Sequence, residues 1–289
     1  SANRFVFETQ YQQNPKEIPL IGLKHINLKA ASDEIRKQFQ PKETPIISKE
    51  EAKQNQQVLV DVDFVHLHNH TQFSVLQSTI SVKDLVKAAV QNKMPAVAIT
   101  DIGNMMGAFH FVRDILYHNK SAEAKNKAAI EAGETPTETI IKPIVGCEFF
   151  VCDNHKDKSR KDNGYQIVLL AKNKKGYHNL AKMSSIAFTE GFYYVPRIDK
   201  QVIQQYKEDI IVLSGSLYGE ISSKLLNIGE NQAEESLLWW KENFEDDFYI
   251  ELMRHNQEDE NRVNNSLIDL AKKHNVKTVA TNNVFYVNK

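Results

Sequence analysis

The sequence predicts an α/β fold in which seven strands alternate with helices and close into a distorted (β/α) barrel. From residue 63 onward, short β-branched apolar runs are separated by longer stretches whose apolar residues recur with helical spacing. Strands separated by helices pair in parallel, because the helix carries the chain back across the sheet. Seven such strands favour a closed barrel, although the pattern alone leaves an open sheet as an alternative.

The predicted strands are short runs rich in Val, Ile, Phe and Tyr, which fit a pleated and partly buried surface. In chain order they cover residues 64–70, 96–100, 142–152, 165–171, 209–214, 248–252 and 278–286.

The predicted helices fill most of the intervals between the strands. The first, residues 81–93, places Val82, Leu85 and Ala89 on one face. Trp239 and Trp240 fall late in another, and at least one of them is expected in the core, with a partner surface as the alternative. The remaining helices cover residues 108–118, 175–188, 217–227, 231–244 and 258–274.

Three segments depart from this alternation. Residues 119–140 are polar and rich in Ala, Lys, Glu and Thr, which indicates a mobile insert. Residues 153–164 replace the helix expected after the third strand, and their mixed charges favour a solvated loop over a nucleic-acid contact. Residues 1–60 differ in composition and are interpreted as an N-terminal extension or linker. The opening Ser1 indicates a chain cut from a longer protein.

Composition excludes several classes of protein. With 36 basic and 37 acidic residues, the chain lacks the basic excess of a dedicated nucleic-acid binder, although local basic patches remain possible. Its two cysteines, Cys147 and Cys152, are expected to be buried apolar residues, and so few of them fit a reducing, cytoplasmic location. The apolar runs all fall short of the roughly 20 residues of a membrane span, so no membrane partner is expected.

Histidines and carboxylates gather where the predicted strands end, the edge that carries the active site in parallel α/β barrels. His66, His68 and His70 lie two residues apart, so they share one face of the first strand, and two histidines so placed could chelate one divalent metal. The alternative is a set of hydrogen-bonded core histidines. Asp101 follows the second predicted strand, and Glu148 lies within the third. Such carboxylates could bridge metal ions, or they could instead accept hydrogen bonds from backbone amides.

His255 follows the sixth predicted strand. We interpret it as a surface or capping histidine rather than a metal ligand.

Several strings resemble one known family. His68-Asn69-His70 followed by Phe73-Ser74-Val75-Leu76 resembles the opening motif of PHP domains, which occur in polymerases and histidinol phosphatases. Residues 94–101 and 142–148 resemble the polymerase branch, and so do residues 213–217 and 279–286. The string Ala-Phe-Thr-Glu-Gly-Phe-Tyr-Tyr-Val-Pro-Arg-Ile-Asp at 187–199 is similar to PHP domains of bacterial DNA polymerase III alpha subunits.

The resemblance covers residues 61–289. It implies a distorted seven-stranded (β/α) barrel of the PHP type, as part of a longer polymerase chain.

Active members of this family hold several metal ions, and the resemblance carries over only part of their ligand set. His68 and His70 match the paired histidines and Glu148 matches the bridging carboxylate, with Asp101 expected to support them from behind. Amide and apolar side chains cannot replace anionic ligands. We therefore expect a vestigial site without catalytic residues that holds at most one weakly bound Zn or Mn ion. Other residues stand at six ligand positions, namely Gln77, Ile102, Gln166, Ser216, Asn283 and Phe285.

The resemblance implies a structural module as the first expectation for function. The module would brace the polymerase palm of the same chain and offer a surface to a proofreading exonuclease, while the whole protein replicates DNA as a Mg-dependent nucleotidyltransferase. The alternative is a metal-dependent 3'-5' exonuclease or phosphoesterase. A free-standing phosphatase of the histidinol-phosphate type is a third possibility, and the string at 191–199 counts against it.

Overall fold

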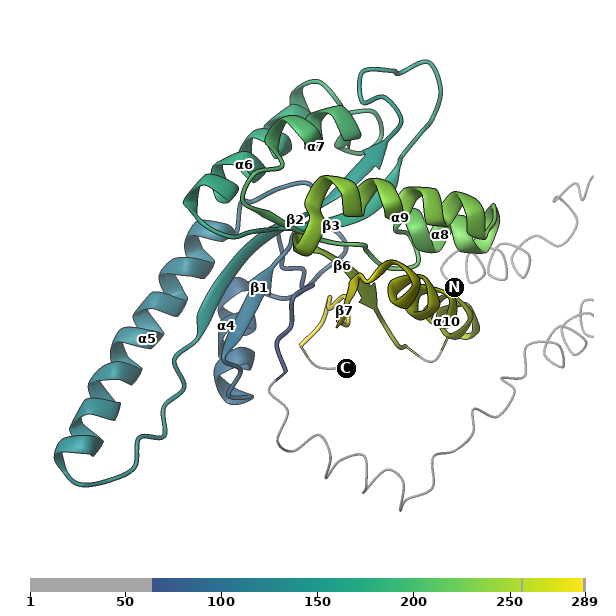
Figure 1. Cartoon of the computed structure of the whole chain (residues 1–289). Helices are drawn as coiled ribbons and strands as arrows, with labels where there is room; N and C mark the ends of the chain where they lie inside the picture. Colours follow the sequence, from purple (N-terminus) through teal and green to yellow (C-terminus); the bar gives the residue numbers. More distant parts are fainter. Residues whose placement is uncertain (1–63, 256, 288–289) are drawn as a thin grey trace, which may run out of the picture. The chain divides into compact units, whose positions relative to one another are not determined.

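The computed structural model describes residues 64–255 and 257–287, and the predicted extension at residues 1–60 lies outside this part of the chain. The described strands form a mixed sheet in the order β1-β2-β3-β5-β6-β7, with β4 paired to β2 (Figure 1). The strands are β1 (Ala96–Ile99), β2 (Lys142–Cys152), β3 (Tyr165–Ala171), β4 (Arg197–Asp199), β5 (Ile210–Leu213), β6 (Phe248–Leu252) and β7 (Lys277–Ala280).

One strand runs against the others. β3 is antiparallel to both β2 and β5, whereas the remaining pairs are parallel. The reason lies in residues 153–164, which contain no helix and return the chain directly from β2 to β3. Antiparallel neighbours can be joined by such a loop, whereas parallel neighbours need a longer crossover. The sequence predicted that residues 153–164 contain no helix, but it did not predict the antiparallel direction of β3.

The predicted first strand, residues 64–70, is not part of the sheet. Its backbone instead reaches two segments at once: Ala98 N donates to His66 O at 2.9 Å, and His70 N donates to Val284 O at 2.9 Å. Val284 N in turn donates to His68 O at 3.0 Å. This segment therefore links the end of the sheet at β1 to the chain after β7 through isolated bonds. The described strands form a curled half-barrel, and the closed seven-stranded barrel is not confirmed.

The helices confirm most of the predicted pattern. Ser81, Asn173 and Asp199 each accept a backbone hydrogen bond at a helix start, which stabilises an otherwise unpaired N–H group. α7 and β4 are short and were not predicted. The helices are α4 (Val82–Gln91), α5 (Ala108–Glu131), α6 (Lys174–Thr189), α7 (Lys200–Tyr206), α8 (Glu220–Asn227), α9 (Glu230–Phe244) and α10 (Glu258–His274), with a 3-10 turn at Glu245–Asp247.

Helix α5 is longer than expected. The prediction of a mobile insert at residues 119–140 is wrong for residues 119–131, which continue the helix. Ala, Lys and Glu are strong helix formers, so the composition that suggested mobility also favours helix. The segment between the end of α5 and β2 is hydrogen-bonded to α5 by two amide side chains. Asn119 bonds both backbone groups of Ile141, and Asn126 bonds both of Glu138.

Alternation along the strands separates two faces of the sheet. In β2, Cys147 and Phe149 lie on the face of the sheet that is covered by α6, α9 and α10. This face forms the main core, which also contains the buried Trp240. The inner face carries a small apolar cluster of Ala98, Val168, Leu170 and Leu213. Glu148 pairs with Val168 across the ladder, so it points to this inner face. Both cysteines are buried free thiols, as predicted.

A membrane-spanning helix is not found among the described residues.

Candidate metal-binding site

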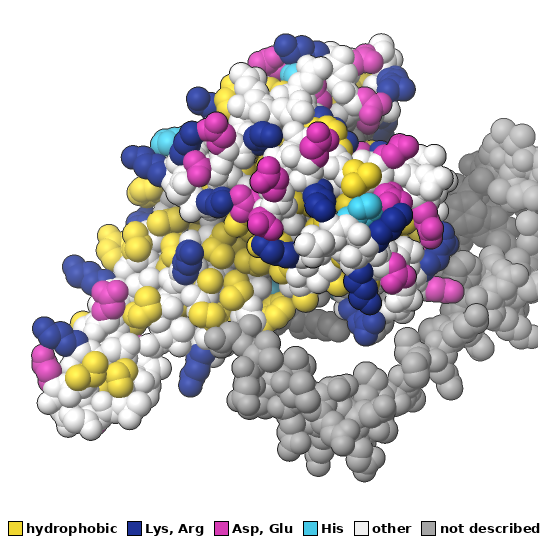
Figure 2. Space-filling view, viewed as in Figure 1, with side chains coloured by type: hydrophobic (Ala, Val, Ile, Leu, Met, Phe, Trp, Pro, Cys, Tyr) yellow, Lys and Arg dark blue, Asp and Glu magenta, His cyan; other side chains and the backbone are white. Residues whose placement is uncertain are grey.

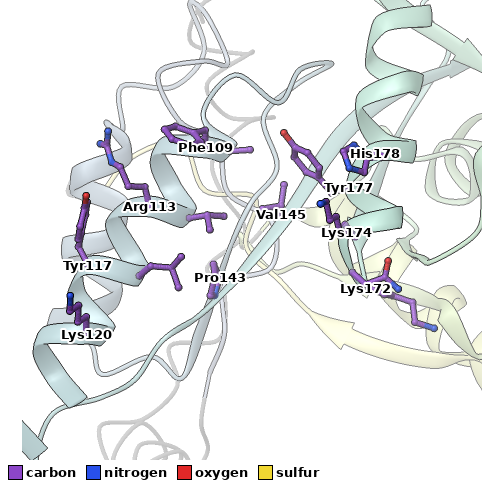
Figure 3. A pocket seen from close by; sticks show the side chains of 15 residues that line it. Phe109, Arg113, Tyr117, Lys120, Pro143, Val145, Lys172, Lys174, Tyr177 and His178 are labelled. Carbon is purple, nitrogen blue, oxygen red and sulfur yellow. The ribbon is translucent and has the colours of Figure 1, made fainter. Parts of the chain in front are cut away.

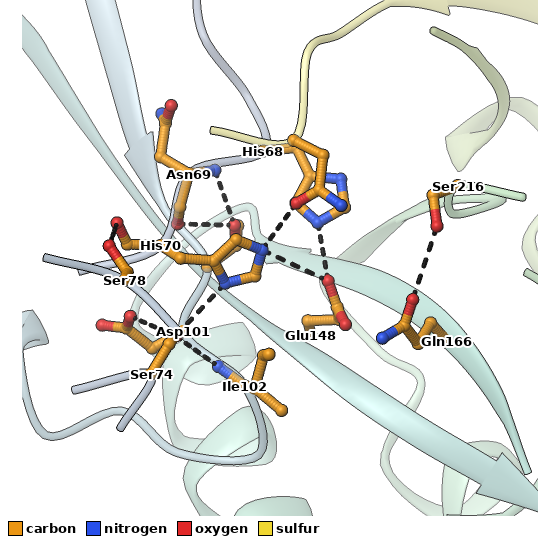
Figure 4. A network of polar contacts seen from close by, with 12 residues as sticks. His68, Asn69, His70, Ser74, Ser78, Asp101, Ile102, Glu148, Gln166 and Ser216 are labelled. Carbon is orange, nitrogen blue, oxygen red and sulfur yellow. Dashed lines mark hydrogen bonds and ion pairs between the residues drawn. The ribbon is translucent and has the colours of Figure 1, made fainter. Parts of the chain in front are cut away.

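Two histidines and two glutamates meet on the inner face of the sheet. Figure 4 shows His68 and His70 directed at Glu148. His68 and His70 belong to the segment that precedes α4, Glu148 lies on β2 and Glu251 lies on β6. All four side chains are buried. Groups far apart in the chain are thus held together in a site closed to bulk water, where their charges interact strongly.

His68 lies between the two carboxylates. Its Nε2 is 2.7 Å from Glu148 Oε2, and its Nδ1 is 2.8 Å from Glu251 Oε1, which also accepts a hydrogen bond from Thr281. Burial by itself lowers the pKa of His68, but the charge of Glu251 and the hydrogen bonds to both glutamates raise that pKa to about 10. A protonated His68 therefore donates to both carboxylates.

Glu148 is the shared partner of the two histidines. Burial raises the pKa of its carboxyl group, but the hydrogen bonds of His68 and His70 outweigh burial and lower that pKa to about 2. His70 Nε2 lies 3.4 Å from Glu148 Oε2. The ionised carboxylate is thus held by imidazole groups, the pairing expected where no metal ion bridges them.

His70 is enclosed on three sides. Its Nε2 lies 2.8 Å from Asn283 Oδ1, its Nδ1 lies 3.2 Å from Ser74 Oγ, and the ring of Phe285 stacks on it with centroids 4.3 Å apart. An amide and an apolar ring therefore contact His70 at two of the positions where the family resemblance implies ligands. The ring of Phe285 thus packs directly beside the histidine.

Asp101 does not reach the metal-ligand candidates directly. It accepts hydrogen bonds from the Thr71 backbone at 2.6 Å, from Thr71 Oγ1 at 2.6 Å and from Ser74 Oγ at 2.7 Å. Because the Ser74 hydroxyl donates to Asp101, it accepts from His70 Nδ1 and from the backbone of Ile102. Asp101 therefore orients His70 through Ser74.

The remaining predicted positions lie around this centre or away from it. Ser216 Oγ is 3.4 Å from Gln166 Oε1, so these two side chains bond each other. Gln77 is exposed in a turn. Ile102 is half-buried. Its neighbours in the chain, Asp101 and Gly103, form backbone hydrogen bonds with Glu148.

His255 is only partly buried. It bonds Glu260 at the start of α10 with Nδ1–Oε1 at 2.6 Å, which fits the predicted surface or capping role. The Glu260 bond raises the pKa of His255.

Glu251 is a site residue that sequence reasoning missed. It is the single acidic residue in the apolar strand Phe248–Leu252, and it lies on the same face as Tyr249. A charged side chain inside a predicted buried strand is itself a signal of a partner or a site. Ser74 and Thr281 carried no such signal.

The arrangement can accommodate one metal ion. His68, His70 and Glu148 each offer one ligand atom, and these atoms lie within 4.8 Å of one another. Glu148 Oε1 and Glu251 Oε2 are buried without a hydrogen-bond partner in the described part of the chain. A hydrogen bond from His68 Nδ1 to Glu251 leaves Nε2 directed at the shared centre, as in carboxylate–histidine–metal sites. Imidazole and carboxylate ligands suit Zn or Mn.

Residues 66–255 match the family model for the PHP domain. Similar curated proteins include DNA polymerase III alpha subunits, 33% identical over 250 residues in Chlamydia trachomatis, 36% over 230 in Borreliella burgdorferi and 37% over 236 in Aquifex aeolicus. Each alignment covers 78% of this chain and 18% of the relative. A solved structure of a metal-dependent phosphoesterase candidate from Bifidobacterium adolescentis has a TM-score of 0.45 at 13% identity, covering 79% of this chain and 90% of that one.

Proposed function

The chain belongs to the PHP domain family, and we propose that it is the PHP portion of a replicative DNA polymerase III alpha subunit whose metal site has become structural. In this role, buried ion pairs replace the metal bridge and join β2, β6 and the segment that carries the two histidines. The single observation that carries the proposal is His68, which bonds Glu148 and Glu251 at the same time.

The surroundings of the histidines support this proposal. Hydrolytic metal sites keep an open coordination position and, for phosphodiesters, often a second metal ion. Here Phe285 covers one face of His70 and Asn283 occupies its Nε2 side. Among the described residues, one set of three potential metal ligands converges, namely His68, His70 and Glu148. Three ligands are too few for a multinuclear cluster.

The wider setting is part of the same proposal. Residues 61–289 would form the PHP domain and residues 1–60 an extension, within a longer cytoplasmic protein that carries the polymerase palm. That protein would act in DNA replication as a DNA-directed DNA polymerase that transfers nucleotides with Mg. A proofreading exonuclease and DNA would be its partners. The support is the similarity to alpha subunits, of which this chain spans 18% of the length.

A metal-dependent 3'-5' exonuclease or phosphoesterase is the second candidate. It is favoured by the convergence of three donors within 4.8 Å and by the unpartnered Glu148 Oε1. A divalent ion held by His68, His70 and Glu148 would supply Lewis-acid activation of a phosphodiester. Glu251 would orient His68, and Asp101 would orient His70 through Ser74.

Two measurements on the purified chain separate the candidates. Elemental analysis for zinc, manganese and iron is expected to give well under one metal ion per chain. Hydrolysis of a labelled single-stranded oligonucleotide is expected to match that of a folded His68→Ala/His70→Ala variant. Stoichiometric metal, together with nuclease activity that the double substitution abolishes, would instead establish the second candidate.

A further inference from the structure

A second feature of the domain lies away from the histidines, between α5 and α6. These helices flank a groove of about 840 Å³ whose floor is formed by Pro143 and Val145 of β2 (Figure 3). Val112 and Leu116 of α5 line one wall, and Tyr177 of α6 lies opposite. The groove is therefore mainly apolar, with α5 along one side and the start of α6 on the other.

Helix α5 has apolar residues on two faces. Phe111 and Ile115 are fully buried and pack in the core cluster that also contains α4 and β1. Phe109 and Leu116 lie on the groove side and remain 71% and 56% exposed. A surface helix normally buries one apolar stripe and exposes a polar face. The second stripe leaves a contiguous apolar surface, which in soluble proteins marks an interaction site. Figure 2 shows apolar side chains gathered over this region.

The margins of the groove are positively charged. Arg113 and Lys120 stand on the α5 side, with Lys172 and Lys174 on the opposite side (Figure 3). Among the described residues, the lining contains no Asp or Glu, although the whole chain has a net charge of -1. Within the described residues, Lys120 and Lys174 form no ion pair, whereas Arg113 and Lys172 pair with acidic residues outside the lining.

We propose that this groove binds an acidic amphipathic α-helix of a partner protein. The apolar stripe of that helix would contact Val112, Leu116 and Val145, and acidic side chains on its flanks would meet Lys120 and Lys174. Phe109 and Lys120 are eleven positions apart on one helix, or about 16 Å at 1.5 Å per residue, which matches roughly three turns of a bound helix. The proposal is independent of the role of the histidine site.

The distribution of side chains favours a helix over nucleic acid. Aliphatic groups lie at the centre of the groove, and the rings of Phe109, Tyr117 and Tyr177 also line it. Among the described residues the cations stand at its margins, as expected where the apolar face of an amphipathic helix enters a groove. A single-stranded nucleic acid needs cations along its whole path in addition to aromatic faces on which bases stack.

The test uses the whole 289-residue chain and two fluorescein-labelled synthetic helical peptides. Both carry Leu at i, i+3, i+4 and i+7 repeats, and the flanking positions are Glu in one and Lys in the other. Fluorescence anisotropy is expected to show the Glu peptide binding at least about tenfold more tightly than the Lys peptide. The Leu116→Glu variant should weaken the Glu peptide by about tenfold or more.

Matched variants separate the groove from general surface effects. Ile130→Glu places the same charge on the same helix, beyond the groove, at a side chain that is 62% exposed, and should leave binding unchanged. Lys120→Glu/Lys174→Glu should reduce the preference for the Glu peptide, whereas Lys127→Glu should not. Circular dichroism verifies that each variant is folded.

Three results would overturn the proposal. One is binding of neither peptide, or equal binding of both. Another is a single-stranded oligonucleotide that displaces the Glu peptide and depends on Leu116, which would identify a nucleic-acid groove. The third is a dimer in sedimentation analysis that Leu116→Glu dissociates, which would show that a second copy of the chain covers the groove.

Discussion

His68 connects the two buried carboxylates of the site. Its imidazole is the only group in the described part of the chain that bonds both Glu148 and Glu251, and all three side chains are buried. Each glutamate also retains one oxygen without a hydrogen-bond partner there. Loss of the imidazole would leave carboxylates buried without a cation, which costs more than loss of an exposed pair.

We expect His68→Gln to lower the free energy of unfolding by about 3 kcal/mol or more, because removing one partner of a buried ion pair typically costs that much. Urea unfolding monitored by circular dichroism measures the change. His110→Gln, at an exposed position, is the matched control and should change stability by less than about 0.5 kcal/mol. A similar small effect at His68 would show that the buried network is not held by its charge.

The same network predicts a pH window of maximal stability. The pKa of His68 is raised from 6.5 to about 10, so its contribution is complete below pH 6.5 and is lost as the pH rises toward 10. The pKa of Glu148 is lowered from 4.5 to about 2, so its contribution is present above pH 4.5 and is lost as the pH falls toward 2. Unfolding free energies should therefore be highest near pH 4.5–6.5.

His68→Gln should remove the decline above pH 6.5 that this histidine contributes. An alkaline decline of equal size in the wild type and the variant would contradict the assignment.

Asn283 offers a test of how far the site is from binding metal. Its Oδ1 lies 2.8 Å from His70 Nε2, so Asn283→Asp adds an anionic oxygen beside the three existing donors. We expect zinc affinity to rise by about tenfold or more, measured by competition with a chromophoric chelator. Asn282→Asp, at the exposed neighbour, is the control for added charge. Equal affinities in both variants would place the metal elsewhere.

At the scale of elements, the loop between β2 and β3 is organised by one buried arginine. The Arg197 guanidinium donates to the carbonyls of Asp157 and Asp162 at 2.9 and 2.8 Å and also reaches those of His155 and Gly191. Asp199 bonds the His155 side chain at 2.5 Å and also begins α7. The string at 187–199 thus connects this loop to α6, β4 and α7. Most of the loop is exposed, as the sequence predicted, but His155 is buried.

We expect Arg197→Lys to destabilise the protein by about 2 kcal/mol, because a lysine cannot reproduce the planar fork that satisfies several buried carbonyls. Hydrogen exchange should also become faster in residues 153–164. Arg160→Lys, on the exposed part of the same loop, should change neither quantity measurably. If lysine fully replaces arginine at 197, charge rather than geometry holds the loop.

At the scale of the whole molecule, the described residues contain their own core. The main cluster draws on β2, β3, β5 and β6 together with α6, α9 and α10, and a second cluster joins α4, α5 and β1. A compact unit with its own core is expected to fold alone. The fragment 61–289 should therefore show one cooperative thermal transition, with a midpoint within a few degrees of that of the whole chain. A fragment that fails to fold would refute the proposed domain boundary.

The sequence by itself determined the elements and the chemical character of the site. Apolar periodicity placed β2, β3, β6 and α10 within about a residue of their observed bounds, because burial of one face is recorded locally. The alternation His68, Asn69, His70 and the acid Glu148 in an apolar strand indicated the site in the same local way. Phe285 was recognised as an apolar residue in the site through the family resemblance.

Only the tertiary structure decided which way the strands run and which side chains meet. The direction of β3, the position of residues 64–70 outside the sheet and the partnership of His68 with Glu251 all depend on contacts between distant parts of the chain. His68 and Glu251 are 183 residues apart, and no local pattern records that distance. The groove beside α5 is of the same kind, since a periodic stripe shows that a face is apolar but not whether the fold covers it. Side-chain period is a property of short segments, whereas pairing and coverage are properties of the path that the whole chain takes.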